Sequence, residues 1–282
     1  MTALTVVVPA HDEEALIEGT LRRILSVPAG EIDLIVVANG CSDATAERAR
    51  SVEGVRVIET ARASKIAALN AGSDAVETYP VAFVDADVAV DGQVLLELAR
   101  RLDDDAVALV AAPRLRVLPS RSWWVRQYYR VWALTDYRTT AHVGSGIYML
   151  REAGRERFGE FPDVIADDLF VQRLFAPDER LAVGDLEFTV QAPATLRALV
   201  GRNGRIAAGN RQLAQERPDL TTGERGTGVS RLARRVAPRP GLWAGFVVYS
   251  VVYLLAQRRG ERMLRSTAPV QWTRDDTTRV VS

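Results

Sequence analysis

Cysteine is almost absent from this chain, which has one, Cys41, in 282 residues. A single thiol excludes a disulfide within the chain and is typical of proteins from a reducing compartment. The N-terminus has no charged leader followed by an apolar run, so we expect no secretion signal and a cytoplasmic location. Internal repeats and low-complexity tracts are also missing, so nothing indicates a repeat architecture.

An excess of charge of one sign is missing too. Lys plus Arg and Asp plus Glu number 36 each, which gives a formal net charge of +0 at pH 7. A balanced chain is not drawn to the phosphate backbone, so we do not expect nucleic acid as a partner. The balance is uneven, because residues 197–239 are rich in arginine and residues 163–187 are mostly acidic. With 48% hydrophobic residues, the chain can build a sizeable core.

A hydrophobic run of membrane-spanning length is the third missing feature. Residues 242–256 (LWAGFVVYSVVYLLA) are uncharged, but these 15 residues fall short of the roughly 20 that span a bilayer upright. Trp243 and Tyr253 near the ends, with Arg239 and Arg258 outside them, suit a membrane interface. They favour association with the inner face of the cell membrane over the alternative, a buried C-terminal helix packed on the rest of the protein.

Short β-branched runs alternate with helical patterns over the first 110 residues. The alternation is typical of βαβ units and predicts an α/β fold with a mostly parallel sheet flanked by helices. Ligands of such sheets bind beyond the carboxyl ends of the strands, so the polar residues there are the first site candidates. Strands are predicted at 5–9, 33–38, 55–59 and 81–84, and helices at 13–25, 44–50 and 65–76.

The pattern is less regular after residue 110. Helices are predicted at 122–138 and 167–175, and strands at 144–150 and within 181–190. A polar region with helical pieces follows from 192 to 239, before the apolar segment 242–256. We therefore predict a first domain at residues 1–195 and a C-terminal helical region at residues 196–282.

Two carboxylates, Asp85 and Asp87, leave the end of the predicted strand 81–84 one residue apart. At a turn both can reach one site, and their hard oxygens suit Mg²⁺ or Mn²⁺ bound to a diphosphate. Such a cation neutralises charge on a departing nucleoside diphosphate. The alternative is a pair of solvated turn aspartates, because D-x-D is short and frequent. Its place after the fourth strand favours the metal site.

A second carboxylate pair, Asp167 and Asp168, opens a predicted helix. Acidic residues are favourable in a first helical turn, which is one explanation of the pair. The other is that one of them is a general base, which must lie within hydrogen-bond reach of an acceptor hydroxyl. Neighbouring carboxylates raise each other's pKa, which suits a base.

Five segments together resemble the family 2 glycosyltransferases, whose motifs they match in order from residue 4 to about 175. The opening VVVPAHDEE at 6–14 is similar to the family's V-P-A-(aromatic)-N-E-E, and VANGCSDAT at 37–45 to its D-D-G-S-T-D-x-T turn. SKIAALNAG at 64–72 is similar to its G-K-x-x-A-L-N-x-G helix. Asp85-Ala86-Asp87 and Asp167-Asp168 match its D-x-D and E-D motifs.

This resemblance implies a GT-A fold and transfer of a sugar with inversion. The donor would be a UDP-, GDP- or dTDP-sugar, and the acceptor a glycan or a lipid-linked molecule in cell-envelope glycan, polysaccharide or glycolipid synthesis. Residues 1–110 would form the nucleotide-binding half of the domain and residues 111–195 the acceptor-side half. A divalent metal, Mn²⁺ or Mg²⁺, would assist.

The resemblance also assigns roles by position. Asp87 would ligate the metal, Asp85 would contact ribose or metal-bound water, and Asp168, beside Asp167, would be the general base. Lys65 would lie near the base or diphosphate. The base and ribose would be held by Pro9, Ala10, Glu13, Asn39 and Asp43. Gly144 and Gly146, around Ser145, would let the backbone approach a sugar or acceptor closely.

The sequence departs from the family at three places. Asn39 replaces the aspartate that pairs with uracil, and an amide both donates and accepts, so the preferred base is open. Asp167 replaces a longer glutamate. The Q-x-x-R-W motif of processive synthases is missing, which favours single addition. Its nearest substitutes, Arg202 and Arg205, would grip a diphosphate from one helix face, or else lie in a solvated basic loop.

Two other functions compete with transfer. A sugar-nucleotide pyrophosphorylase normally has a G-x-G-x-R loop after its first strand, where this chain has Pro9-Ala10-His11-Asp12. An inactive homologue that binds nucleotide sugars or a protein partner would not need a complete carboxylate set. Asp85, Asp87 and Asp168 are all present, which argues against it.

Overall fold

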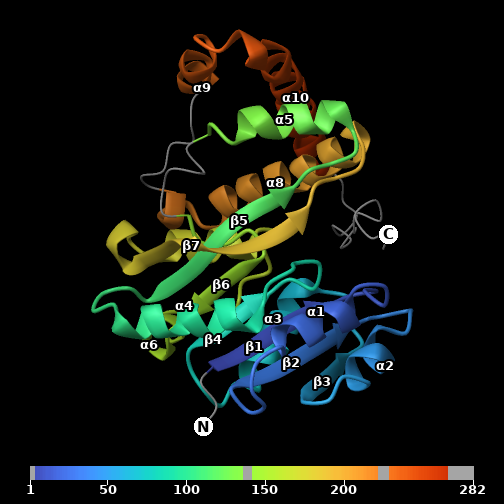
Figure 1. The fold of residues 1–282 in the computed structure, drawn as a ribbon, viewed down its shortest axis with the longest axis vertical. Coiled ribbons are helices and arrows are strands. Elements are labelled where there is room, and N and C mark those ends of the chain that lie inside the picture. Colours follow the sequence, from blue (N-terminus) through green and yellow to red (C-terminus); the bar gives the residue numbers. More distant parts are fainter. Residues whose placement is uncertain (1–3, 136–141, 222–228, 266–282) are drawn as a thin grey trace.

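A seven-stranded sheet organises the protein (Figure 1). The computed structural model describes residues 4–135, 142–221 and 229–265. The strand order is β3-β2-β1-β4-β6-β5-β7, and within these residues β6 alone runs antiparallel to the other strands. The strands are β1 (Leu4–Ala10), β2 (Ile32–Asn39), β3 (Val55–Thr60), β4 (Val81–Val84), β5 (Val110–Leu118), β6 (Ile147–Leu150) and β7 (Arg180–Gln191). The predicted mostly parallel α/β sheet is confirmed.

Helices cover both faces of this sheet. On one side lie α1 (Ile17–Ile24), α2 (Thr45–Arg50) and α4 (Gly92–Asp104), and on the other α3 (Lys65–Asp74) and α7 (Asp167–Leu174). The short α6 (Glu152–Arg155) follows β6. This sandwich explains why the central strands read as continuous apolar runs, since both of their faces are buried.

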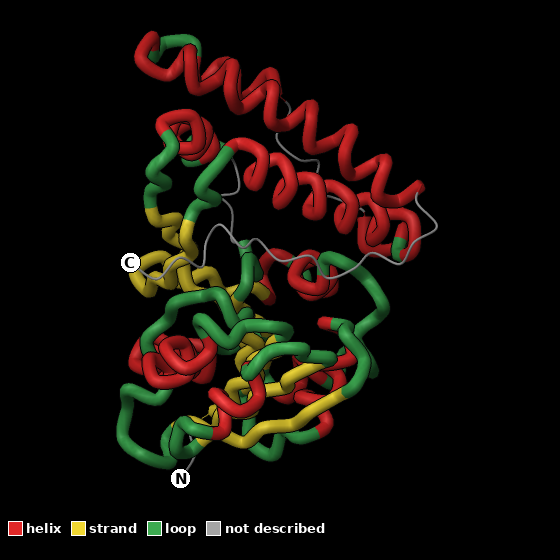
Figure 2. Tube along the Cα trace, turned by 90° about the vertical axis from the view of Figure 1, so that its right-hand side faces the viewer, coloured by secondary structure: helices red, strands yellow, loops and turns green. Residues whose placement is uncertain are grey.

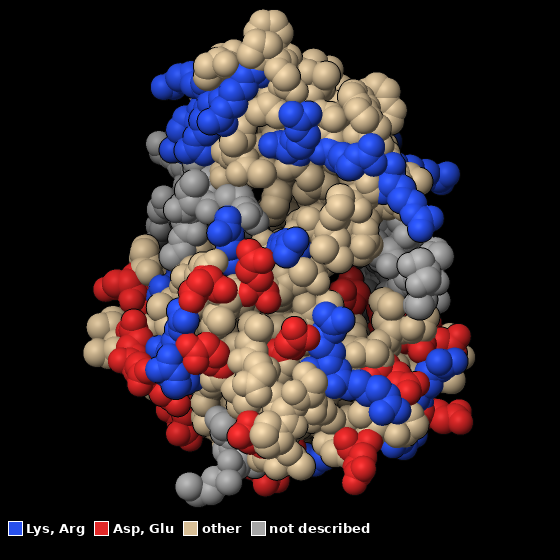
Figure 3. All heavy atoms as spheres, viewed as in Figure 1, with Lys and Arg blue, Asp and Glu red and all other residues tan. Residues whose placement is uncertain are grey.

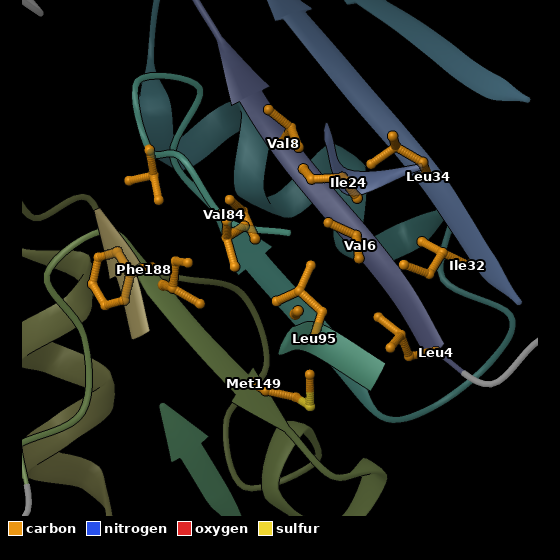
Figure 4. Close-up of a cluster of buried hydrophobic side chains, with 14 of the residues drawn as sticks. Leu4, Val6, Val8, Ile24, Ile32, Leu34, Val84, Leu95, Met149 and Phe188 are labelled. Carbon is orange, nitrogen blue, oxygen red and sulfur yellow. The ribbon is translucent and has the colours of Figure 1, made fainter. Parts of the chain in front are cut away.

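Strand β1 shows how the sequence builds the core, because every one of its seven residues is buried. Val6 and Val8 lie with Ile24 of α1 and Leu95 of α4 on one face of the sheet (Figure 4). Val7 points to the opposite face, where the side chains of α3 and α7 pack. Successive strand residues alternate between faces, so one β-branched run supplies two cores.

A separate helical layer lies beyond the β5–β7 edge of the sheet (Figure 1). It consists of α5 (Trp123–Trp132), α8 (Leu196–Glu216), α9 (Val229–Val236) and α10 (Trp243–Arg265). Its own clusters join Val125 and Tyr128 of α5 to Leu199 of α8 and Val248 of α10. The long helices α8 and α10 run side by side (Figure 2).

The observed elements differ from the predicted ones at several ends. Helix α1 begins at Ile17 and not at Glu13, because Asp12 adopts a φ of 51° and the backbone N–H of Glu13 donates to Thr45 Oγ1. Helix α4 and strand β5 were not predicted at all. The polar stretch after residue 192 contains one continuous 21-residue helix, α8. Helix α10 extends nine residues beyond the apolar run, and residues 136–138 of the predicted 122–138 helix lie outside the described residues.

Candidate active site

Three elements bring charged side chains together at the carboxyl end of β4. Lys65, the first residue of α3, places its Nζ 2.7 Å from Asp85 Oδ1 and 2.9 Å from Asp167 Oδ1. Asp85 follows β4 directly, and Asp167 opens α7. The structure therefore brings together three residues, 20 and 82 positions apart in sequence, that belong to three different motifs.

Lys65 is the only lysine in the chain, because the other 35 basic residues are arginine. Burial lowers the pKa of Lys65, but the charges of Asp167 and Asp85 outweigh burial and leave the pKa above its ordinary value. A compact ammonium can bridge two carboxylates, whereas the planar arginine fork suits one. Its unique occurrence was a signal in the sequence that motif matching did not use.

Negative charge exceeds positive charge at this site. Burial, partly opposed by Lys65 and reinforced by Asp167 and Asp87, raises the pKa of Asp85 to about 7. Asp87 lies two residues on and is exposed. The site has more carboxylate groups than the single ammonium of Lys65 can neutralise. A hard divalent cation binds such oxygens, and it would relieve the repulsion that helps to raise the pKa of Asp85. The donor set therefore suits Mg²⁺ or Mn²⁺.

Asp167 is enclosed by protein. Its side chain is almost fully buried, Lys65 contacts Oδ1, and the Tyr148 hydroxyl donates to Oδ2 at 3.3 Å. Burial and the neighbouring Asp167 charge raise the pKa of Tyr148 well above its usual value, so Tyr148 remains a donor. Both oxygens of Asp167 are thus engaged inside the protein.

Asp168 is held differently. The backbone N–H of Ser145 donates to its Oδ2 at 3.0 Å and that of Leu169 to its Oδ1 at 2.8 Å. The residue is partly exposed. Burial and the charge of Asp167 nevertheless raise its pKa, against the opposing effects of Lys65 and these two N–H groups. Asp168 is therefore the partly exposed member of the pair, and its raised pKa makes it more basic than an ordinary aspartate.

The segment Gly144-Ser145-Gly146 has positive φ at all three residues: 117°, 71° and 105°. A Cβ on Gly144 would lie 2.9 Å from Asp168 Cβ, and one on Gly146 would lie 2.8 Å from Val88 Cγ2. The carbonyl of Gly146 also accepts the N–H of Asp85 at 2.8 Å. These glycines were predicted to admit a sugar. In the structure they let the backbone reach the site carboxylates, and the sugar contact stays a prediction.

The loops after β1 and β2 are locked to each other. Asp43 accepts the N–H of Glu14 at 3.2 Å and that of Thr45 at 3.0 Å, and Glu14 in turn accepts the N–H of Ala44 at 3.1 Å. Asp43 therefore shapes the predicted nucleotide pocket through backbone contacts. Pro9, Ala10 and Glu13 are buried at the same end of the sheet.

Asn39 is completely buried, and its Nδ2 donates to Ala10 O at 2.8 Å. Its buried Oδ1 has no hydrogen-bond partner within the described part of the chain. His11 Nδ1 lies 2.7 Å from Asn39 O, and the ligand atoms of His11, Asp12 and Cys41 all lie within 4.8 Å of one another. The sequence motifs did not indicate this cluster, although each of its residues lies within a matched segment.

Arg202 and Arg205 occupy the middle of α8, so the basic-loop alternative is wrong. Gly209 of the same helix abuts Ile165 and Ala166, immediately before the Asp167-Asp168 pair. Residues four and seven positions before Gly209 share its helix face. This spacing places both arginines on the side of α8 that faces the site, and their contact with a diphosphate stays a prediction.

Comparison with known proteins identifies the family. The profile of Glycosyl transferase family 2 matches residues 5–156. Uncharacterized glycosyltransferases of Mycobacterium tuberculosis and Mycobacterium bovis are 33% identical over 159 residues, covering 55% of this chain and 68% of each relative.

Solved structures share the fold at low identity. The mannosyltransferase PcManGT from Pyrobaculum calidifontis, in complex with GDP-Man and Mn²⁺, superposes with a TM-score of 0.61 at 18% identity, over 95% of this chain and 76% of that chain. S. aureus TarS 1–349 superposes with a TM-score of 0.53 at 16% identity, over 93% and 92%. Glucosyl-3-phosphoglycerate synthase from M. tuberculosis, in complex with Mn²⁺, UDP-Glc and phosphoglyceric acid, gives 0.53 at 21%, over 72% and 77%.

These matches confirm the GT-A fold and the enzyme class that the motifs implied. The family profile begins in β1, passes through β4 and both of its aspartates, and ends just after α6. Because it covers more than half of the sequence, the chain belongs to glycosyl transferase family 2.

Proposed function

We propose that the protein transfers a sugar from a nucleoside-diphosphate donor to an acceptor hydroxyl with inversion, with Asp168 as the general base. The observation that carries this proposal is the asymmetry of the aspartate pair. Lys65 and Tyr148 occupy both oxygens of Asp167, whereas Asp168 is held by two backbone N–H groups and remains partly exposed.

A hydroxyl is a weak nucleophile at neutral pH, so its proton must pass to a base as the new bond forms. Asp168 takes that proton while the acceptor oxygen attacks the anomeric carbon and the nucleoside diphosphate leaves from the opposite face. The Ser145 N–H aims the carboxylate, and the raised pKa makes it a better base than an ordinary aspartate. Because the base works ionised, kcat falls as the pH drops through this pKa, above the usual aspartate range.

The donor lies along the carboxyl ends of β1, β2 and β4. Asp87 and Asp85 would hold Mn²⁺ or Mg²⁺, which would supply charge neutralisation on the leaving diphosphate. Two proteins of similar fold bind such donors, the mannosyltransferase with GDP-Man and Mn²⁺ and the synthase with UDP-Glc and Mn²⁺. The loops locked by Asp43 hold the base and ribose of a UDP-, GDP- or dTDP-sugar, and Lys65, Arg202 and Arg205 contribute positive charge toward the diphosphate.

We divide the chain into a donor side, an acceptor side and a C-terminal region. Residues 1–110 bind the nucleotide, residues 111–195 carry the acceptor side, and the predicted C-terminal region 196–282 contributes the described helices α8, α9 and α10. A lipid-linked or glycan acceptor at the inner face of the cell membrane suits these helices. We therefore assign the reaction to cell-envelope glycan, polysaccharide or glycolipid synthesis. Addition of a single sugar is favoured, because the arginines of α8 stand in place of the processive Q-x-x-R-W motif.

The two aspartates form the decisive test. Asp168→Asn keeps the shape of the side chain but cannot take the proton, so we expect kcat to fall about a hundredfold or more. Asp167→Asn, the matched control, changes a residue assigned to positioning and should be milder. Calorimetric titration of Mn²⁺ with UDP and GDP should give unchanged donor affinity in Asp168→Asn. A less active Asp167→Asn would reverse the assignment, and near-normal rates in both variants would refute the mechanism.

The inactive-homologue alternative has its own outcome in the same titration. Tight metal-dependent nucleotide binding, with no nucleotide release in the presence of any acceptor fraction, would support it. A pyrophosphorylase would instead form a nucleotide sugar from a nucleoside triphosphate and a sugar phosphate. Release of nucleoside diphosphate on addition of an acceptor extract distinguishes transfer from both.

A further inference from the structure

One face of helix α10 packs against the rest of the protein. Its buried residues are Gly245, Val248, Val252, Ala256 and Gly260, which recur every three or four positions and form a single stripe. A Cβ on Gly245 would lie 2.8 Å from Gln127 O of α5, and one on Gly260 would lie 2.9 Å from the backbone N of Ala208 of α8. Small residues thus seat α10 directly against the backbones of α5 and α8 along its length.

The opposite face of α10 is apolar and exposed. Exposed fractions are 57% for Trp243, 62% for Val247, 49% for Val251 and 57% for Leu254. These four residues, spaced four, four and three positions apart, form what we call the outer stripe. Trp123 and Trp124, at the start of the adjoining α5, are also about half exposed. Large exposed apolar side chains gathered on one helix face mark a contact surface and not an ordinary solvated one.

Positive charge surrounds this stripe. The segment 229–265 contains eight arginines and a single acidic residue, Glu261, and the segment 120–133, which includes α5, adds three arginines and no acid. Figure 3 shows blue side chains around the helical layer, whereas the red side chains gather over the sheet domain. Arginine lies at both ends of the stripe, in Arg239 before it and Arg258 after it.

Length and composition alone would allow the helix Pro240–Arg265 to cross a membrane. Its packing argues against a crossing. Its uncharged run, residues 240–257, is about 27 Å long at 1.5 Å per residue, against a hydrocarbon core of about 30 Å, so length does not decide the matter. Helix α8, packed along α10, carries Arg202, Arg205 and Arg211 and would have to enter the bilayer with it. A helix with one protein-bound face and one apolar face fits the plane of an interface.

We propose that the helical layer docks on an anionic lipid bilayer with α10 lying flat, its outer stripe in the headgroup region and the flanking arginines on lipid phosphates. Charge selects this partner: a second copy of the chain would bring two arginine-rich surfaces together, whereas an anionic leaflet complements them. Docking itself needs no sugar transfer. Its consequence, that a lipid-linked acceptor is delivered past α8 to the Asp167-Asp168 loop, rests on the proposed function.

Vesicle flotation tests the docking without an activity assay. The full chain should float with vesicles of equal parts phosphatidylcholine and phosphatidylglycerol, but not with phosphatidylcholine alone, and salt should weaken binding because the attraction is screened. The double variant Val247→Glu, Leu254→Glu should lower binding at least about tenfold. Val107→Glu is the matched control, since Val107 is 53% exposed on the sheet domain, and it should bind as the wild type does.

The angle of α10 can be measured separately. In a Cys41→Ser background, which removes the only cysteine, spin labels at Val247→Cys and Val251→Cys should report shallow immersion of about 5–10 Å, with Val107→Cys in water. A spin label found at the bilayer midplane would show that α10 crosses the membrane and does not lie on its surface. Equal flotation of the double variant, or no flotation of the wild type, would overturn the proposal. A dimer that Val247→Glu dissociates, without vesicle binding, would assign the stripe to a second copy.

The variant Asp168→Asn distinguishes a failure of the docking proposal from a failure of the proposed mechanism. This variant should lose transfer and float normally. If the wild type floats as expected while Asp168→Asn turns over normally, the membrane proposal stands and the mechanism falls. If transfer depends on Asp168 but the wild-type protein does not float with anionic vesicles, the docking surface is wrong and the mechanism stands.

Discussion

The carboxylate site and the helical layer both reverse the ordinary rule of burial, in opposite directions. At the site, Asp167 places a charge inside the protein beside the half-buried Lys65, where an isolated charge is costly. On α10, Trp243 and Val247 place apolar surface outside. Each reversal persists because regular packing around it holds the side chains in place. In our two proposals each region is completed by a partner, a cation and nucleotide at the site and a lipid surface at the helical layer.

The two regions also differ in how charge is used. The site combines both signs within 3 Å, so its charges act on each other and on a bound ion. The layer carries nearly one sign, spread over a surface, so its charges act collectively at longer range. Changes in the site should therefore alter chemistry with little salt dependence, whereas changes in the layer should alter binding in a salt-dependent way.

Of the variants considered, Asp87→Asn should have the largest effect on activity, and it should act at the carboxylate site alone. The amide keeps the shape but loses the charge that draws a divalent cation, so we expect donor binding to lose its metal dependence and transfer to fall about a thousandfold. Calorimetry with Mn²⁺ and UDP, alongside a rate assay, measures both. Flotation should not change. Full activity of the wild type in excess EDTA would show that the site works without a metal.

Lys65→Met comes next. It leaves Asp85 and Asp167 facing each other without the intervening ammonium, and we expect the free energy of unfolding to fall by about 2–3 kcal/mol, since Asp85 is partly solvated. Mn²⁺ should restore more stability in this variant than in the wild type, because the cation replaces the lost charge. Thermal melts with and without Mn²⁺ check this.

Arg62→Met is the control for that variant. Arg62 lies just before α3 and pairs with Asp163 at 3.6 Å, but both side chains are largely exposed. An exposed pair of this kind contributes little, so stability should change by less than about 0.5 kcal/mol. A similar loss in both variants would mean that the site pair is no more important than a surface ion pair.

Gly144→Ala should have an intermediate effect. The residue has a φ of 117°, and the added Cβ would meet Asp168 Cβ at 2.9 Å. We expect a loss of about 1–3 kcal/mol in stability and about tenfold in kcat, because Asp168 is pushed off its Ser145 contact. Gly159→Ala, whose Cβ would meet no described atom within 4 Å, is the control and should leave both quantities unchanged. Wild-type kcat in Gly144→Ala would remove this loop from the catalytic geometry.

The sequence predicted the first four strands of the sheet well. Strands β1 to β4 were placed within one or two residues of their ends, because β-branched apolar runs between turn residues have few other structures available. Strand β5 was not predicted, since its Val110-Ala-Ala-Pro113 opening has few β-branched residues and a register shift follows Pro113. Helix α4 was not predicted either, although Leu95, Leu98 and Leu102 have helical spacing.

The site could be located from sequence but not resolved. Motif order indicated Asp85, Asp87 and the Asp167-Asp168 pair, yet nothing in the sequence showed Lys65 between Asp85 and Asp167. That contact joins α3, β4 and α7 and depends on tertiary packing. Helix α8 was obscured for a related reason: Gly204 and Gly209 weaken its intrinsic helix propensity, and the structure shows that Arg259 and Ala166 pack against them.

Val247→Glu should have the smallest effect on the isolated protein, and its neighbour sharpens the comparison. Val247 is 62% exposed on the outer stripe, whereas Val248 is 9% exposed and packs with Val125 and Leu199. Consecutive positions on a helix point about 100° apart, so the same substitution meets water at one residue and the protein interior at the next.

Val247→Glu should change the free energy of unfolding by less than about 0.5 kcal/mol and leave turnover of a soluble acceptor intact. Val248→Glu buries an unpaired carboxylate and should cost about 3 kcal/mol or more. Chemical denaturation of both variants, with vesicle flotation of each, measures the contrast. If Val247→Glu were as destabilising as Val248→Glu, the outer stripe would be packed against protein, and the layer would have no surface to offer a membrane.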